Sequence, residues 1–220
     1  MAEDSLIDRM RRKKQQIDDA RGLYWKPQKG ENYVRVLPSY EGPNMDFHIE
    51  VPVHYRVGPN RRTVTCLAFW GDVCPVCQRA ERLEESTSVD DQNLASSMMP
   101  KMRILTNVLP NNDPEGTVKI WSVSPNVFSD LLSYYTGTGW GDFTHPKTGY
   151  NFTVTLKDTG RKMPDGNMVS ETEIRGDRES TVLGKKMTRK DLHNLQGIID
   201  RNRYTRQEVI AILRGEEVDR

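Results

Sequence analysis

The chain has 220 residues, of which 35% are hydrophobic and 29% charged, with a mean hydropathy of −0.72 and a formal net charge of +1. This composition predicts a modest apolar core under a large hydrated surface, within one domain or a core with a small insertion. It argues against a membrane protein, because no apolar run approaches the length of a membrane span. It also excludes a globally basic protein, so any basic surface must be local.

Residues 1–21 form a charged arm that opens the chain. The arm holds a basic cluster at Arg9–Lys14 and three apolar residues, Leu6, Met10 and Ile17, roughly on one helical face. We predict a helix there that frays unless it docks. No apolar stretch typical of a signal peptide is present, so we expect a cytoplasmic protein in a reducing environment.

Alternating apolar and polar residues predict strands through the middle of the chain. These strands cover residues 32–40, 47–57, 62–69, 102–110, 116–124 and 150–159. Turn-forming residues separate two pairs of them at 58–60 and 111–116. Helices are predicted over 78–86 and 126–135, and the polar stretch 160–184 is predicted to be a hairpin or a loop.

Two helices are predicted at the end of the chain. Thr188–Asp191 caps the first, and Thr205–Glu208 forms a capping box before the second. Their apolar stripes comprise Leu192, Leu195, Ile199, Val209, Ile212 and Leu213. Such stripes suit the packing of a terminal helix pair onto the core, and they also suit a face that binds a partner.

The cysteines predict a metal site. Cys74-Pro75-Val76-Cys77 has the spacing with which two thiolates bind one tetrahedral ion from a tight turn. Cys66 and His54 lie upstream and complete a set of one imidazole and three thiolates. Four protein ligands form a closed shell, which is typical of structural zinc. We therefore predict one structural Zn²⁺ ion bound by His54, Cys66, Cys74 and Cys77.

Other interpretations of these residues remain open. A redox-active C-x-x-C pair would leave Cys66 unexplained, and all three cysteines could simply be buried. His48 is a second candidate for the histidine ligand. In addition, His48-Ile49-Glu50 followed by C-x-x-C imitates the signature of zinc-dependent nucleobase deaminases. Against the deaminase, Val73 replaces the expected proline, and the residues around Glu50 alternate like a strand.

The predicted elements favour a mainly β fold that also contains helices. Short strands with one internal helix are typical of small barrels, of which the five-stranded Greek-key OB-fold is the commonest. The predicted organisation is an arm at 1–21, an OB-fold core at 22–187 and a C-terminal helical segment at 188–220. A zinc-binding subdomain is inserted into the core at about 50–100.

Basic and aromatic residues alternate in several predicted strands, as in barrels that bind single-stranded nucleic acids. Between Val51 and Trp70 there are three arginines and no acidic residue. The predicted DNA-binding residues are Arg35, Tyr55, Arg56, Arg61, Arg62, Trp70, Lys101, Arg103, Lys119 and Trp121. The simpler interpretation is that such arginines form the hydrated face of a half-buried sheet.

The order of these motifs resembles that of the zinc-containing single-stranded DNA-binding proteins of tailed phages. The likeness covers roughly Trp25 to Lys157. Its most specific parts are the His-Cys-Cys-x-x-Cys order with CPVCQ, the strand VRVLPS and the segment DPEGTVKIW. The resemblance implies an OB-fold with an inserted zinc subdomain, and a cleft between them through which single-stranded DNA passes.

Residue roles follow from the resemblance at some positions only. Arg35 matches a basic residue on the cleft wall, and Trp121 matches an aromatic that lines the cleft. Lys101 and Arg103 fall in a basic segment of the family. However, Ile104-Leu105 replaces the aromatic pair that is typical of the same strand. This replacement weakens the expectation of base stacking there.

The ends of the chain match the family less well. The basic arm is similar in kind to the family's arm, which contacts the neighbouring molecule on DNA. Family members finish in a long acidic tail that recruits replication proteins, whereas residues 201–220 contain five arginines and four acids. A helical end replaces that tail, or the tail lies outside this chain.

The sequence thus predicts a non-enzymatic single-stranded DNA-binding protein that coats and protects DNA during phage replication, recombination and repair. Its predicted partners are single-stranded DNA, neighbouring copies of itself through the arm, and replication proteins, in the host cytoplasm and without a membrane. The alternatives are a deaminase-like zinc enzyme and a zinc-ribbon adaptor that binds protein.

Overall fold

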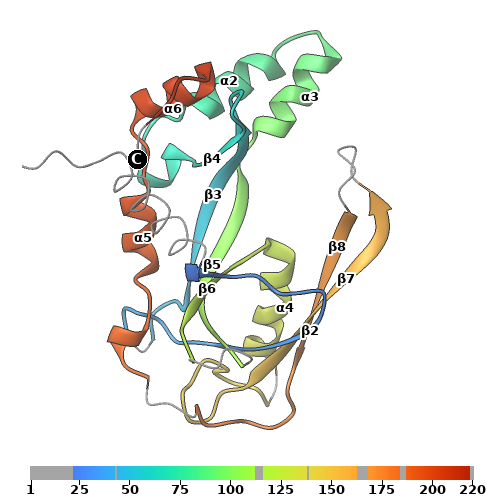
Figure 1. The fold of residues 1–220 in the computed structure, drawn as a ribbon, viewed down its shortest axis with the longest axis vertical. Helices are drawn as coiled ribbons and strands as arrows, with labels where there is room; N and C mark the ends of the chain where they lie inside the picture. Colours follow the sequence, from blue (N-terminus) through green and yellow to red (C-terminus); the bar gives the residue numbers. More distant parts are fainter. Residues whose placement is uncertain are drawn as a thin grey trace, which may run out of the picture. The chain divides into compact units, whose positions relative to one another are not determined.

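Figure 1 shows the computed structural model, which describes residues 22–42, 44–111, 116–137, 139–162, 168–183 and 187–218. The chain divides into two compact units. We call residues 22–48 with 106–193 the sheet unit, and residues 49–105 with 194–218 the cysteine unit. The predicted arm at 1–21 lies outside the described residues.

The strands are β1 (Tyr24–Trp25), β2 (Gly30–Val36), β3 (His48–Val57), β4 (Arg62–Thr65), β5 (Lys101–Pro110), β6 (Lys119–Val123), β7 (Asn151–Lys162) and β8 (Met168–Gly176). The α-helices are α2 (Pro75–Glu84), α3 (Val89–Met98), α4 (Pro125–Thr136), α5 (Leu195–Arg201) and α6 (Arg206–Arg214). Two short 3₁₀-helices are η1 (Leu67–Trp70) and η2 (Arg189–Asp191). All the predicted strands up to residue 159 and both C-terminal helices correspond to elements in this series.

The strands form one mostly antiparallel sheet. Its path is β1-β6-β5-β2-β7-β8, and β3 pairs with β4 and with β5. Only the pairing of β1 with β6 is parallel among the registers established for the described residues. Along this path β1 and β8 lie at opposite ends, so the sheet is open where the OB-fold would close into a barrel. The fold is mixed α and β, and the predicted OB-fold is not confirmed.

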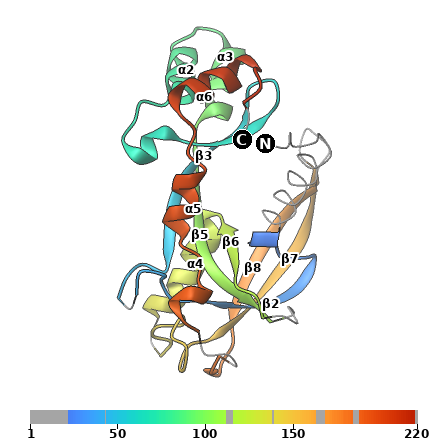
Figure 2. The ribbon, with the colours of Figure 1, turned by 60° about the vertical axis from the view of Figure 1, so that its left-hand side comes forward.

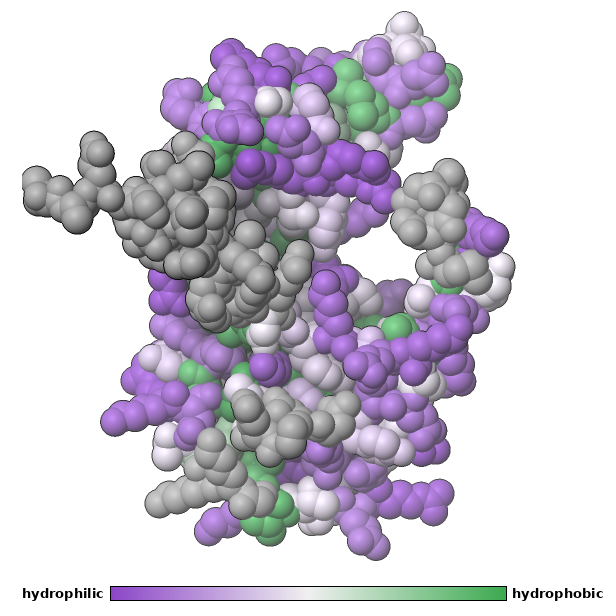
Figure 3. All heavy atoms as spheres, in the orientation of Figure 1, coloured by the Kyte–Doolittle hydropathy of each residue, from purple (hydrophilic) through white to green (hydrophobic). Residues whose placement is uncertain are grey.

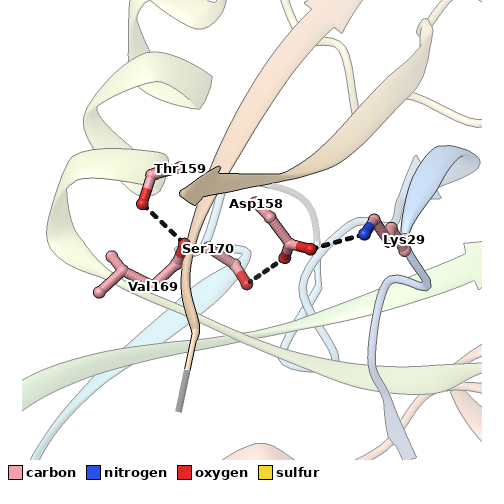
Figure 4. A network of polar contacts seen from close by, with 5 residues as sticks. All are labelled: Lys29, Asp158, Thr159, Val169 and Ser170. Atoms are coloured by element: carbon pink, nitrogen blue, oxygen red, sulfur yellow. Dashed lines mark hydrogen bonds and ion pairs between the residues drawn. The ribbon is translucent and has the colours of Figure 1, made fainter. Parts of the chain in front are cut away.

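The polar stretch after residue 159 contains a hairpin, which was one of its two predicted forms. β7 and β8 pair along most of their length, and Figure 4 shows side-chain bonds that join the two strands and a lysine that bonds to β7. Lys29 Nζ donates to Asp158 Oδ2 at 2.6 Å, while Ser170 Oγ donates to Asp158 Oδ1 at 3.4 Å. Thr159 Oγ1 donates to the Val169 carbonyl at 2.8 Å. The bond from Lys29 ties the chain just before β2 to β7, and the other two bonds join β7 to β8.

Helix α4 packs its apolar stripe into the core of the sheet unit. Val127, Phe128 and Leu131 recur at helical spacing and are buried. In Figures 1 and 2 this helix lies beside the strands of the same unit. The rings of Phe143 and Phe152, 5.1 Å apart and edge to face, extend this core. The helix predicted over 126–135 is confirmed.

The cysteine unit gathers short elements around one small buried cluster. This cluster consists of Val57, Val64, Cys66, Leu67, Cys74, Val76, Val209 and Ile212. Two of its members come from α6, which begins at the predicted capping box of Thr205 and Glu208. The sequence predicted a C-terminal helical segment from residue 188. Residues from 194 onward belong to the unit that contains the cysteines.

Candidate metal centre

Four side chains of the cysteine unit converge on one point. The ligand atoms of His54, Cys66, Cys74 and Cys77 all lie within 4.8 Å of one another. His54 Nε2 is 3.4 Å from Cys74 Sγ and 3.5 Å from Cys77 Sγ, and Cys66 Sγ is 3.5 Å from Cys77 Sγ. Three of the four residues are buried and Cys77 is partly exposed. The structure therefore brings together the four residues predicted as metal ligands.

These distances fit a tetrahedral zinc ion. With Zn–S bonds of about 2.3 Å and a Zn–N bond of about 2.0 Å, the edges of a ligand tetrahedron are about 3.8 Å between sulfurs and about 3.5 Å between nitrogen and sulfur. The observed nitrogen–sulfur distances agree with that geometry. Three sulfurs and one imidazole are also the donor set that zinc prefers in structural sites.

Local structure explains how each ligand reaches the centre. His54 lies on β3 and pairs with Val64 on β4. Cys66 follows β4 directly, and its N–H donates to the Pro52 carbonyl of β3 at 2.8 Å. The hairpin thus delivers two of the ligands. The predicted strand 62–69 ends at Thr65 because η1 turns the chain after Cys66.

The other two ligands come from the beginning of α2. Cys74 is the N-cap residue of this helix, Pro75 occupies its first turn, and Cys77 follows in the same turn. Proline suits that position because its fixed φ is helical and no hydrogen bond is lost. The positive end of the helix dipole favours thiolates at both cysteines. The C-x-x-C spacing therefore has its usual structural basis here.

A backbone carbonyl fixes the orientation of the histidine. Nδ1 of His54 lies 2.7 Å from the carbonyl oxygen of Met98 at the end of α3. The N–H at Nδ1 donates this bond, which leaves the lone pair of Nε2 directed at the cysteines. Helix α3 was not predicted, although Ser88 caps it and Asp90 and Asp91 occupy its first turn. The serine cap and the acidic first turn could have indicated this helix from the sequence.

The thiols need a cation to be ionised together. A hydrogen bond from Cys66 lowers the pKa of Cys74 to about 3. The same bond raises the pKa of Cys66, and burial raises the pKa of Cys77. The Cys74 thiolate is thus stable by itself. Its negative charge disfavours ionisation of the Cys66 and Cys77 thiols. A divalent ion among the three sulfurs would favour all three thiolates.

The residues required for a deaminase site do not come together. His48 belongs to the sheet unit, where its ring lies 4.4 Å from that of Phe128. The histidine beside the cysteines is His54, and Cys66 completes the set. The structure therefore supports the four-ligand set and not the His48-x-Glu50 pattern.

Several predicted DNA-binding residues lie together on the β3–β4 hairpin. Tyr55 is 39% exposed, Arg56 and Arg61 are exposed, and Arg62 is partly exposed. Lys101 is exposed and Arg103 partly exposed on β5, which pairs with β3. The structure thus places six of the ten predicted residues on one hairpin and its neighbouring strand.

Trp70 has partners within the cysteine unit. Its indole Nε1 donates to Asp200 Oδ1 of α5 at 2.8 Å, and the Arg203 guanidinium lies 5.1 Å from its ring centre. Arg203 also forms an ion pair with Asp72. These contacts join the C-terminal segment to η1. Trp70 therefore has a structural role here that the prediction of base stacking did not foresee.

Arg35 is a correction to the predicted site. Its side chain is 0% exposed, and its guanidinium donates to Thr181 Oγ1 at 3.0 Å and to the carbonyl of His145 at 2.9 Å. Burial lowers the pKa of Arg35, and the Asp142 carboxylate opposes that effect. The guanidinium remains charged because its ordinary pKa is far above neutrality. In this structure Arg35 organises the interior of the sheet unit and is too buried to contact a phosphate directly.

Trp121 is also an interior residue. Its side chain is 3% exposed and packs edge to face on Trp25, with ring centres 5.1 Å apart. A ring this buried cannot stack on a base without a change in the fold, so the predicted stacking role does not fit. Lys119, on the same strand β6, is partly exposed within the sheet unit.

No protein-family model matches the sequence, and no curated protein matches it. The resemblance to phage single-stranded DNA-binding proteins therefore depends on the motifs alone. In the described part of the chain, no helix combines the length and the apolar character needed to cross a membrane.

Proposed function

We propose that this chain is a non-enzymatic single-stranded DNA-binding protein in which a structural zinc ion supports the binding surface. That surface is the β3–β4 hairpin with the start of β5, and its members are Tyr55, Arg56, Arg61, Arg62, Lys101 and Arg103. The arginines and the lysine bind phosphates, and Tyr55 stacks on a base. In the same proposal the protein coats DNA during phage replication, recombination and repair. Neighbouring copies on the DNA contact one another through residues 1–21.

The observation that carries the proposal is a β-bulge in the hairpin. The pairing of β3 with β4 shifts between His54 and Val57, so Tyr55 and Arg56 together oppose Thr63. In a regular strand two successive side chains would point to opposite faces. Here both are exposed, and Arg56 takes a φ of 57°. Bulges re-aim side chains beside functional sites, and positive φ at a non-glycine residue is retained where function requires it.

Charge supports the same surface. Arg61 in the turn of the hairpin also has a positive φ, of 50°, and its side chain is exposed. No acidic residue occurs from Val51 to Trp70, so this segment of the sequence carries a net positive charge. On the face drawn in Figure 3, hydrophilic residues predominate and hydrophobic residues form small separate groups. A polar, anionic partner suits such a surface.

The zinc ion would act through the hairpin. His54 lies directly before the bulge and Cys66 directly follows β4, so the metal would hold the two strands of the hairpin together. The ion contributes no reaction step in this proposal. It stabilises a unit whose buried cluster is too small to fold firmly without it.

Replacing hairpin residues tests the proposal. Arg61→Gln and Arg62→Gln should each reduce the slope of log affinity against log salt by roughly 0.7 on single strands, because each removes one phosphate contact. Tyr55→Ala should weaken binding by about 1–3 kcal/mol through lost stacking. Filter binding of a fluorescent oligonucleotide at several salt concentrations measures both effects.

The matched control is Lys147→Gln, which removes one exposed charge from the sheet unit. It should leave both the slope and the affinity unchanged. If the hairpin variants keep their zinc and their melting temperature and still bind like the control, the hairpin is not the binding surface.

A further inference from the structure

The sheet unit contains a pocket that none of the predicted functions uses. It has a volume of about 810 Å³ and lies between the end of α4 and the end of β8. Its lining includes Tyr134, Trp140, Arg175, Arg178 and Thr181. Pockets of a few hundred to about 1,000 Å³ are the size that holds small organic ligands. Every lining residue belongs to the sheet unit, so the pocket is independent of the metal centre.

Two aromatic rings form its apolar wall. Tyr134 and Trp140 stand nearly at right angles, at 79°, with their centres 4.9 Å apart. Tyr134 Oη donates to the Ile174 carbonyl of β8 at 3.4 Å. Trp140 lies against Gly176, where a Cβ would come within 2.7 Å of the indole. Glycine at this position therefore lets the ring lie against β8. A flat ligand could stack on one ring while its edge meets the other.

Charged groups of both signs complete the pocket. Arg175 and Arg178 are exposed, and so is Glu179, while Asp177 is partly exposed. Guanidinium groups bind phosphate through paired hydrogen bonds. Carboxylates accept hydrogen bonds from the amino groups of cytosine, adenine and guanine. Thymine carries no such amino group.

A third cation lies behind the pocket. Thr181 lines it and accepts a bond from the buried Arg35 at 3.0 Å through its hydroxyl and another at 3.1 Å through its carbonyl. Gly149 leaves room for this guanidinium, because a Cβ there would come within 2.6 Å of Arg35 Nη2. The charge of Arg35 is thus held next to the pocket wall by backbone and hydroxyl groups. It adds to the attraction for an anion.

We propose that this pocket binds one nucleotide that carries an amino-bearing base, which is adenine, cytosine or guanine. The base lies against Trp140 and Tyr134 with its amino group at Asp177 or Glu179, and the phosphate lies at Arg175 and Arg178. The source of the nucleotide is either a free mononucleotide or one residue of a DNA strand. This site is additional to the hairpin surface proposed above.

Nuclear magnetic resonance of the full chain tests this site with dAMP, dTMP and deoxyadenosine as probes. The indole N–H signal of Trp140, assigned with Trp140→Phe, should shift saturably with dAMP and more weakly with dTMP. Arg178→Gln should weaken dAMP binding by about five- to tenfold and leave deoxyadenosine unaffected, because only the phosphate contact is lost. The matched control is Arg161→Gln, an exposed arginine further along the same hairpin that does not line the pocket.

A short oligodeoxyadenylate distinguishes the two sources of the nucleotide, a DNA strand and a free mononucleotide. Saturation of the Trp140 signal at a lower concentration than with dAMP indicates a strand, and a response to dAMP alone indicates a free nucleotide. Arg61→Gln should leave the dAMP response unchanged, so failure of the hairpin proposal would not affect this result. If neither dAMP nor the oligonucleotide shifts Trp140 in the folded protein, or if Arg161→Gln weakens dAMP as much as Arg178→Gln does, the pocket is not a nucleotide site.

Discussion

Cys66→Ser is expected to abolish the binding of one zinc ion per chain and to unfold the cysteine unit. Structural zinc sites of this kind contribute on the order of 10 kcal/mol to folding. Replacing one of three thiolates removes a ligand and leaves a buried hydroxyl among sulfurs. Metal analysis measures the zinc content, and amide hydrogen exchange should show lost protection in α2 and α6 while β7 and α4 stay protected.

Histidine variants provide the controls. His54→Gln should lose zinc as Cys66→Ser does, whereas His48→Gln and His145→Gln should keep full zinc content, because neither residue belongs to the cluster. If His48→Gln lost the metal while Cys66→Ser kept it, or if Glu50→Gln altered a deamination rate, the deaminase interpretation would replace the structural one.

Gly58→Ala is expected to destabilise the cysteine unit by about 4 kcal/mol. A Cβ on Gly58 would lie 1.9 Å from the carbonyl oxygen of Ile212, so α6 could not keep its place against the hairpin. The backbone at Gly58 also has a positive φ of 67°, which disfavours alanine. Thermal unfolding of the zinc-loaded protein measures the change.

Gly71→Ala separates the steric clash of a Cβ from the backbone strain of a positive φ. Gly71 has a similar φ of 80°, but a Cβ there would meet nothing within 4 Å. Its replacement should therefore cost only the backbone strain, about 1–2 kcal/mol. If Gly58→Ala cost no more than Gly71→Ala, α6 would not pack against the hairpin as described.

The metal ligands could be predicted because their spacing alone carries the information. C-x-x-C places two thiols in one helical turn. Cys66 and His54 supply the other two ligands of a tetrahedral site. The capping box at Thr205 likewise predicted the beginning of α6. In contrast, the similar box at Thr188 begins only the short 3₁₀-helix η2, and α5 begins later at Leu195. A cap indicates where a helix can begin, and tertiary packing decides whether it continues.

The faces of the strands could not be predicted to the same degree. On β2 exposed and buried residues alternate from Glu31 to Val34, but Arg35 breaks the alternation and is buried, because the loop that includes His145 covers it. Trp121 is buried by a two-residue strand, β1, which is too short to leave a periodic signal. Both errors have the same origin, since contacts between segments distant in the sequence decide which side of a strand is exposed.

The sequence also could not predict whether the sheet closes into a barrel. Alternation predicts strands but not their partners, and the barrel was inferred from the number of strands and from the family resemblance. In the structure β8 pairs with β7 at one end of the sheet path, while β1 pairs with β6 at the other. Pairing depends on the geometry of loops whose length and composition leave several topologies open.

The most direct test of single-stranded DNA binding is a titration of the zinc-loaded protein with an oligodeoxythymidine and with a duplex of the same length, at low and at physiological salt. Tryptophan fluorescence or anisotropy of a labelled strand reports binding. We expect the single strand to bind at least about a hundredfold more tightly than the duplex, with an affinity that falls steeply as salt increases. Equal affinity for the two, or no binding of the single strand by protein that carries its zinc, would contradict it.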